Sequence, residues 1–362
     1  MLAVILTLAA CALQQPNYPE PPPLLISESD VDVEEVDLLA VTPAMRKFLE
    51  EYIWSYSDID TRLYLLTLAV TSSGVLGFDY DESRTLTAAD AFETRSGNCI
   101  GFSNLMVALA RESGLRASYQ EVYRQPEWTA QEDTILLVKH INVLISSPRR
   151  TYIVDVSGYR TNPETRRAVI TDLEAKTLYL NNLGAEALLE NDLARAYAYL
   201  AKAIDLAPQN TDSWVNLGVV YGRNDQLDDA EMAFQTVLKT DPGELSAMSN
   251  LYEVYMAQEN FEAAERVHAK VDRYRRKNPY YLMKLSEEER ELGRYSESIA
   301  LLERAIKKKG NDHMLYYELA KTQYLSGETV VAQNSLLRAR ELAPQHLVVH
   351  YNQPLEVLVA EE

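Results

Sequence analysis

A cysteine, a histidine and an aspartate occur in an order and in settings that suit a thiol nucleophile. Cys99 stands at the start of a predicted helix over residues 100–112, which Ser113 and Gly114 terminate. A cysteine at a helix N-terminus lies at the positive end of the helix dipole, near N–H groups that stabilise a thiolate. We expect Cys99 to be a reactive thiol; the alternative is a buried structural cysteine, which is inert.

The two possible partners of Cys99, His140 and Asp155, lie inside apolar runs. His140 interrupts the run over 136–145, and Asp155 interrupts the run over 152–156. A charged or polar side chain in a buried strand is costly unless it is paired. On neighbouring strands, Asp155 could hold the imidazole of His140, which would deprotonate the thiol or pair with the thiolate. Asn142 is a weaker alternative for the third residue.

The surrounding segment, residues 42–176, mixes two periodicities. Helical spacing of apolar residues predicts helices over 45–56 and 61–72, and a short helix over 87–95 precedes Cys99. Residues rich in Val, Ile, Leu and Tyr predict strands over 118–123, 134–145 and 151–156. The helix that begins at Cys99 therefore precedes the strands that would carry its partners.

This segment resembles the bacterial transglutaminase-like domain over roughly residues 85–157. The resemblance rests on Gly97-Asn98-Cys99, matching G-x-C, and on Arg111, Gly114, Leu115 and Ala117, matching R-x-x-G-[IL]-x-A, followed by His140 and Asp155. It implies an α+β domain whose Cys-bearing helix packs on an antiparallel sheet. It also implies a papain-like Cys-His-Asp triad, with Cys99 as nucleophile, His140 as base or ion-pair partner and Asp155 as orienting residue.

The same resemblance implies acyl transfer through a thioester. The backbone N–H of Cys99 would contribute to the oxyanion hole, with Gln120 or Tyr119 as a second donor. Relatives often have a Trp shortly after the His, where this chain has Asn142-Val143. That departure leaves the acceptor open between water, giving peptide or amide hydrolysis, and an amine, giving transglutamination. We favour hydrolysis, because no amine-acceptor site is evident. The alternative is a retained fold without activity, used as a binding scaffold.

The C-terminal half repeats with a period of 34 residues, in five units beginning at Thr177, Thr211, Leu245, Pro279 and His313. The seventh position of every unit is Leu, and the twentieth is Ala or Ser. Each unit predicts two amphipathic helices that can bury their apolar faces only by stacking on neighbours. The pattern resembles the tetratricopeptide repeat, which implies an all-α solenoid over residues 177–346. The tail over 347–362 either folds back on the last repeat or leaves that repeat's apolar face to a partner.

Such solenoids have a groove lined by the first helix of each repeat. Asn182, Asn216 and Asn250 share one groove-side position in three consecutive units. Their amides could hold the backbone of a protein or peptide partner. The alternative is that Asn is simply common at this repeat position.

The first eleven residues are an uncharged apolar leader ending Leu8-Ala9-Ala10-Cys11. This ending resembles the bacterial lipobox, in which the cysteine is lipidated, and Ala12 suggests retention at the outer membrane. We therefore expect a lipoprotein signal peptide over 1–11 and a protein anchored in the bacterial cell envelope, facing the periplasm. The alternative is an ordinary cleaved secretory leader. Residues 12–41, proline-rich and then acidic, are expected to form a spacer without a core.

Composition limits the function classes. The net charge is −19, with the acidic residues spread along the chain. Nucleic-acid binding needs a basic patch, so we expect no nucleic-acid partner, and membrane contact only through a lipidated Cys11. The five histidines are scattered and no Gly-rich phosphate loop is present, so we expect neither a metal site nor a cofactor.

Overall fold

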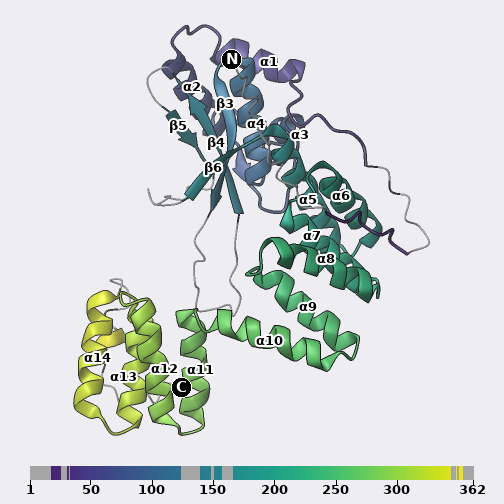
Figure 1. The fold of residues 1–362 in the computed structure, drawn as a ribbon. Coiled ribbons are helices and arrows are strands. Elements are labelled where there is room, and N and C mark those ends of the chain that lie inside the picture. Colours follow the sequence, from purple (N-terminus) through teal and green to yellow (C-terminus); the bar gives the residue numbers. More distant parts are fainter. Residues whose placement is uncertain are drawn as a thin grey trace, which may run out of the picture. The chain divides into compact units, whose positions relative to one another are not determined.

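The computed structural model describes residues 18–25, 31, 33–123, 139–147, 151–156, 166–343, 348 and 350–353. The chain divides into two compact units, one of residues up to 35 with 173–242 and the other of residues 36–172 with 243–362. Along the chain, a part with helices and strands comes first and a part with helices only follows (Figure 1). Among the described residues, no helix combines the length and the apolar character needed to cross a bilayer.

The mixed part is built around one buried helix and one sheet. Its sheet has the strand order β5-β4-β3-β6 and is antiparallel throughout. The helix α4 (Cys99–Glu112) is buried at every residue from Ile100 to Ala110 and packs against β3 and β4. This confirms the predicted α+β class, with the cysteine-bearing helix on an antiparallel sheet. The strands are β3 (Arg116–Tyr123), β4 (Lys139–Ser146), β5 (Thr151–Val154) and β6 (Arg166–Ile170).

Side chains that cap the N–H groups fix where the helices of this part begin. The capping residue in each case is a Thr, Asp or Asn, the types preferred there. In α1, Thr42 forms a capping box with Met45, and Pro43 occupies the first turn, where a missing N–H costs nothing. The helices and their caps are α1 (Pro43–Tyr52) with Thr42, α2 (Ile59–Thr71) with Asp58, α3 (Ala88–Thr94) with Thr87, and α4 with Asn98.

Some boundaries differ from the sequence-based expectations. The helix expected over 45–56 ends at Tyr52, and residues 134–138 of one expected strand lie outside the described residues. The strand β6 and the short parallel pair β1 (Asp79–Tyr80) and β2 (Ser96–Gly97) were not predicted. β1 and β2 have only two residues each, too few to show a period, and β6 is defined by its pairing with β3.

The second part consists of five helix pairs. Their first helices are α5 (Asp172–Leu189), α7 (Thr211–Arg223), α9 (Leu245–Ala257), α11 (Pro279–Glu291) and α13 (His313–Leu325). Their second helices are α6 (Leu193–Leu206), α8 (Leu227–Thr240), α10 (Phe261–Arg275), α12 (Tyr295–Lys308) and α14 (Thr329–Leu342). Four of the five first helices begin at the residue where the 34-residue register begins. The exception is α5, which starts at Asp172, five residues before Thr177.

The turn inside each pair uses a left-handed residue at the same position. These residues are Asn191, Asp225, Glu259, Gly293 and Gly327, with φ between 58° and 90°. Asn, Asp and Gly tolerate this conformation, whereas Glu259 departs from the pattern. The conserved geometry of the turn explains why the repeat register continues without insertion.

The described part of the tail folds back on the last repeat, as one of the two alternatives predicts. The 3₁₀ helix η1 (His350–Asn352) places Tyr351 against α13. The Tyr351 ring stacks on Tyr317 at 4.9 Å, and its hydroxyl is 2.8 Å from Nδ1 of His313. Tyr351 is buried, so the tail covers part of this repeat's surface.

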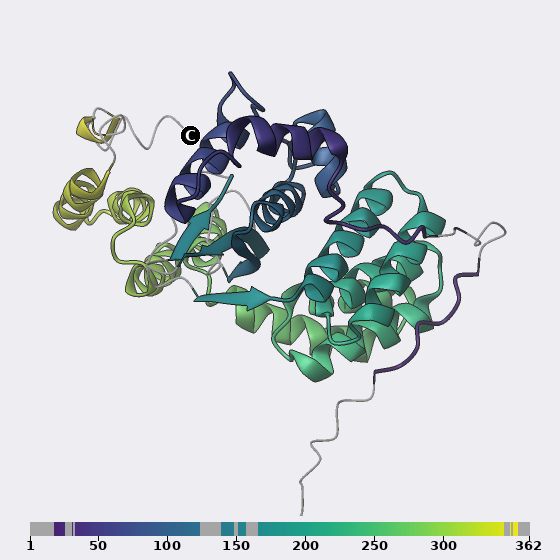
Figure 2. The ribbon, with the colours of Figure 1, turned by 90° about the horizontal axis from the view of Figure 1, so that it is seen from above.

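Part of the expected spacer is in contact with folded chain. Residues 18–25 lie against α7 and α8, as the purple segment beside these helices shows in Figure 2. Further along, Leu38 is buried and its carbonyl accepts a hydrogen bond from the N–H of Ala88. Composition predicted a spacer without a core, because proline-rich chain is extended and acidic chain repels itself. The described contacts are made through backbone groups and two buried leucines, Leu24 and Leu38.

Candidate functional site

Asn98 fixes the position of Cys99 at the start of α4. The Asn98 side-chain oxygen accepts from the N–H groups of Ile100 and Gly101, both at 3.1 Å. Its amide nitrogen donates to Thr85 Oγ1 at 2.7 Å, which ties the cap to the preceding loop. Cys99 is a free, half-buried thiol in the first turn. Sequence analysis missed the role of Asn98, although an Asn directly before a helix is a recognisable cap.

His140 and Asp155 meet as predicted. Nε2 of His140 lies 2.6 Å from Oδ2 of Asp155. The His140 side chain is 5% exposed and that of Asp155 is 14% exposed, so little water competes for the contact. Asp155 comes directly after β5, whose Val154 pairs with Val143 of β4. This pairing brings the carboxylate next to the strand that carries His140.

Asn142 supports the carboxylate. Its side-chain nitrogen donates to the same Asp155 oxygen at 3.2 Å, and Asn142 is fully buried. Asn142 is thus a positioning residue for Asp155, and the weaker alternative in which it orients the imidazole itself does not match this geometry. Two donors on one oxygen hold the carboxylate in the orientation that His140 needs.

The histidine also bonds the thiol. Burial lowers the pKa of His140, but hydrogen bonds with Asp155 and with Cys99, and the charges of both groups, outweigh burial and raise this pKa to about 9. Since Nε2 faces Asp155, Nδ1 is the ring nitrogen left for Cys99. A protonated imidazole between a carboxylate and a thiol is the arrangement that a thiolate nucleophile requires.

Comparisons with known proteins agree with both parts of the fold. The model of the transglutaminase-like superfamily matches residues 65–160, which include Cys99, His140 and Asp155. Two tetratricopeptide repeat models match residues 199–232 and 223–287. The chain carries a transglutaminase-like domain followed by tetratricopeptide repeats.

Individual relatives share only part of the chain. Human Superkiller complex protein 3 is 26% identical over 167 residues, which are 43% of this chain and 11% of that protein. Among solved structures, MamA MSR-1 is 18% identical and covers 46% of this chain and 95% of its own, with a TM-score of 0.26. A second MamA crystal structure is 17% identical, covering 49% of this chain and 97% of its own, with a TM-score of 0.28.

The two candidate oxyanion donors of the transglutaminase-like domain differ in their surroundings. Tyr119 is buried against α4 and donates its hydroxyl to Asn104 Oδ1 at 2.8 Å, so this hydroxyl is already engaged. Gln120 pairs across the strands with Asn142, which puts both side chains on the face of the sheet that carries His140. Gln120 is 7% exposed, and its Oε1 atom has no hydrogen-bond partner. Because the Tyr119 hydroxyl is engaged and Gln120 lies on the sheet face that carries His140, the side-chain nitrogen of Gln120 stays the better candidate donor.

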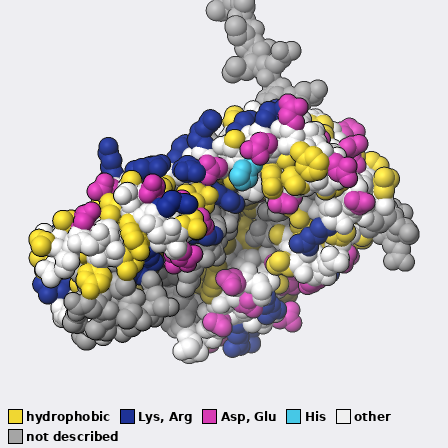
Figure 3. Space-filling model, turned by 90° about the horizontal axis from the view of Figure 1, so that it is seen from below, with side chains coloured by type: hydrophobic (Ala, Val, Ile, Leu, Met, Phe, Trp, Pro, Cys, Tyr) yellow, Lys and Arg dark blue, Asp and Glu magenta, His cyan; other side chains and the backbone are white. Residues whose placement is uncertain are grey.

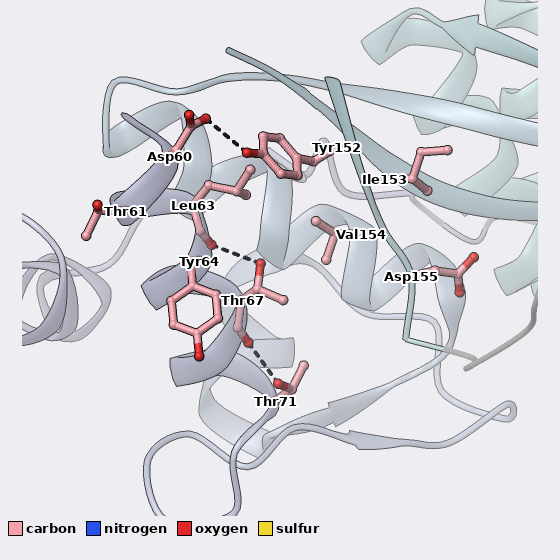
Figure 4. A pocket seen from close by; sticks show the side chains of 10 residues that line it. All are labelled: Asp60, Thr61, Leu63, Tyr64, Thr67, Thr71, Tyr152, Ile153, Val154 and Asp155. Carbon is pink, nitrogen blue, oxygen red and sulfur yellow. Dashed lines mark hydrogen bonds between the residues drawn. The ribbon is translucent and has the colours of Figure 1, made fainter. Parts of the chain in front are cut away.

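A pocket of about 620 Å³ opens beside Asp155, between α2 and β5 (Figure 4). Its walls combine apolar side chains with threonine hydroxyls. Near one end, the Tyr152 hydroxyl donates to Asp60 Oδ1 at 3.1 Å. Asp155 both lines the pocket and contacts His140, so a molecule bound here would lie beside this pair. The lining residues are Asp60, Thr61, Leu63, Tyr64, Thr67, Thr71 and the stretch Tyr152–Asp155.

The predicted groove asparagines lie in three successive first helices, Asn182 in α5, Asn216 in α7 and Asn250 in α9. All three are half-buried. The Asn216 side chain donates to Asn181 Oδ1 at 3.0 Å, so it links α7 to α5. A peptide-binding role for the three stays a prediction.

Figure 3 shows side chains of both charges mixed over the face that it draws. Within the described residues, no group of three His, Cys, Asp or Glu side chains is placed to hold a metal ion. Cys11, the predicted lipidation site, lies outside the described residues.

Proposed function

We propose that the transglutaminase-like domain is a cysteine acyl-transfer enzyme and that the repeats bind its protein or peptide partner. The observation that carries this proposal is the paired arrangement of His140 with Asp155 on one side and Cys99 on the other. The match of a transglutaminase-like model across all three residues supports it.

In the proposed reaction, Cys99 Sγ attacks the carbonyl carbon of an amide, forming a C–S bond while the carbonyl electrons move onto oxygen. The Cys99 N–H and the Gln120 side chain would stabilise that oxyanion. Protonated His140 gives its proton to the leaving nitrogen as the C–N bond breaks, leaving a thioester. Water or an amine then attacks, losing a proton to His140, and the C–S bond breaks to restore the thiolate.

A chromogenic ester tests this step without knowledge of the natural substrate. Mixing the protein with p-nitrophenyl acetate should give a burst of nitrophenolate as Cys99 becomes acylated, followed by slower turnover. Cys99→Ala should abolish the burst and His140→Ala should strongly slow it. Asp60→Asn changes the pocket but none of the three proposed catalytic residues, and it should leave the burst unchanged. Equal release by wild type and Cys99→Ala would contradict the proposal.

The same assay separates water from an amine as acceptor. If water is the acceptor, adding glycinamide should leave the turnover rate and the acetate product unchanged. If the site accepts amines, N-acetylglycinamide should form and turnover should increase. We expect hydrolysis, because nothing in the described residues provides a dedicated amine site.

A scaffold without catalysis is the second candidate function, favoured by the repeats themselves. The name of the human relative places that protein in a complex, and repeat solenoids commonly bind partners. In this case Cys99→Ser would keep full function, while Ala replacements at Asn182, Asn216 and Asn250 would abolish partner capture. The reverse result would support the enzyme.

We further propose anchoring in the bacterial cell envelope through Cys11. The leader over residues 1–11 supports this proposal. Labelling cells with a palmitate analogue should mark the wild type and leave Cys11→Ser unlabelled. Equal labelling of both would contradict lipidation at this position.

A further inference from the structure

The proline-rich segment over residues 18–25 is held on the second repeat by polar contacts to its backbone. The Tyr221 hydroxyl donates to the Pro22 carbonyl at 2.5 Å, and Gln226 Nε2 donates to the Pro23 carbonyl at 3.2 Å. In return, the Leu25 N–H donates to Gln226 Oε1 at 2.8 Å. The amide of Gln226 therefore brackets Leu24 from both sides, as a neighbouring strand's peptide group would.

Two neighbouring side chains of the second repeat also bond the Gln226 amide. Its Nε2 also donates to Asp229 Oδ2 at 2.7 Å, and its Oε1 also accepts from Asn224 Nδ2 at 2.7 Å. Two donors and two acceptor positions are all that a glutamine amide offers, and here all four are used. Asn224 and Asp229 thus orient the two groups that remain for the peptide.

The contacts suit proline. Proline has no N–H, so a proline-rich peptide can be recognised mainly through its carbonyls, and the site offers hydroxyl and amide donors to them. The N–H that the site does use belongs to Leu25, after the last proline. Leu24 between them is 4% exposed and supplies the apolar anchor.

The length of the segment fits an extended chain. Tyr18 reaches Thr240 at the end of α8, with 3.4 Å between their hydroxyl oxygens, while Leu25 lies at the turn before α8. Seven residue steps of polyproline II span about 22 Å. From Gln226 to Thr240, α8 spans about 21 Å. The segment therefore matches α8 end to end only when it is extended.

We propose that Tyr221, Asn224 and Gln226 form a binding site for extended proline-rich peptides, and that residues 18–25 occupy it as a ligand in cis. A proline-rich segment of a partner must then displace the chain's own segment. Because the cis ligand is tethered, it acts at a high effective concentration. The apparent affinity for any competitor is then the intrinsic affinity multiplied by the fraction of sites left open. The site is independent of the thiol chemistry.

The third repeat offers a matched control. Moving 34 residues along the chain from Tyr221, Asn224 and Gln226 gives Tyr255, Gln258 and Asn260. The side-chain types are similar, whereas the contacts with residues 18–25 described above are made by the second repeat. Variants at these positions therefore change the equivalent repeat positions and leave the contacts described above in place.

Peptide binding tests the proposal. A fluorescent peptide with the sequence of residues 18–25 is titrated into the full chain and into a full-length variant whose residues 18–25 are replaced by Gly and Ser. We expect the replaced variant to bind at least tenfold more tightly. Adding Gln226→Ala or Tyr221→Phe to that variant should weaken binding at least fivefold, while Asn260→Ala or Tyr255→Phe should not. Equal binding by the full chain and the replaced variant would overturn the proposal.

Hydrogen exchange in the full chain covers the case in which the free peptide binds too weakly to measure. The Leu25 amide should exchange at least tenfold more slowly than in the isolated peptide, and Gln226→Ala should remove that protection while Asn260→Ala keeps it. An unprotected Leu25 amide would overturn the proposal. If the replaced variant gains affinity but the wild type elutes as a dimer, the segment of a second copy occupies the site, which contradicts occupancy in cis. Alkylation of Cys99 should be the same in all these variants.

Discussion

At the scale of single residues, the contact between His140 and Asp155 governs the charge of the imidazole next to Cys99. A buried imidazole ordinarily loses its proton, because burial penalises the charged form. Here Asp155 and Cys99 favour the imidazolium and raise the His140 pKa to about 9. In the proposed reaction, His140 would therefore hold the proton that the leaving group receives, and the thiol would lie next to a positive charge.

This raised pKa links stability to pH. The ordinary histidine pKa is about 6.5, so folding is favoured by His140 protonation, with the full contribution below pH 6.5. The contribution decreases between pH 6.5 and 9 and is absent above. We expect the urea midpoint to fall across this window in the wild type and to fall less in His140→Gln. Parallel curves for the two proteins would contradict the raised pKa.

Asp155 is expected to cause part of the increase in the His140 pKa. Asp155→Asn removes a charge and a strong acceptor, so the His140 pKa should decrease, as read from the ring proton resonances of His140 in a pH titration. Asp60→Asn, in the same pocket, should leave the titration of His140 unchanged. An unaltered His140 titration in Asp155→Asn would mean that Asp155 does not stabilise the imidazolium.

At the scale of elements, the first turn of α4 determines how Cys99 is presented. Asn98 satisfies two N–H groups of this turn while it bonds Thr85. Asn98→Ala should reduce the free energy of unfolding by about 1 kcal/mol, as is typical when an N-cap is lost. Asn98→Asp should keep the cap, but its negative charge beside Cys99 should move the pH profile of alkylation to higher pH.

The cap of α2 provides the control for these two variants. Asp58 caps α2 by accepting from the Thr61 N–H at 2.8 Å. Asp58→Ala should cost similar stability and leave the alkylation profile unchanged. If the alkylation profile of Asn98→Asp were as unchanged as that of Asp58→Ala, a charge at the N-terminus of α4 would have no electrostatic influence on the thiol.

Two glycines of α7 test how closely the repeat helices pack. A Cβ on Gly218 would lie 2.6 Å from Phe234, whose ring is 1% exposed and cannot move away easily, whereas a Cβ on Gly222 meets no atom within 4 Å. Gly218→Ala should lower stability, because overpacking costs roughly 1–3 kcal/mol against a helix-propensity gain of about 1 kcal/mol. Gly222→Ala should raise stability by up to about 1 kcal/mol. The midpoint of the helical signal in urea measures both, and the same sign for both variants would contradict this packing.

At the scale of the whole molecule, features that leave a pattern in the sequence could be predicted, and contacts that leave no pattern could not. The repeat register predicts where α7, α9, α11 and α13 begin, because each repeat meets the same neighbours. The meeting of His140 and Asp155 follows from two polar residues in buried strands. The contact of Tyr221 with Pro22 spans 199 residues and leaves no periodic signal. For the same reason, β6 is defined by its pairing with β3 and not by its own sequence.

The central claim is that His140 activates Cys99, and one measurement tests it most directly. In the Cys11→Ser protein, Cys99 is the only thiol, so the rate of alkylation by iodoacetamide against pH reports on it alone. An ordinary thiol, with a pKa of about 8.5, is almost wholly protonated at pH 6. We expect the rate at pH 6 to stay high and to fall at least tenfold when His140→Ala is added. A slow rate at pH 6 that the His140 substitution leaves unchanged would show that Cys99 is not an activated nucleophile.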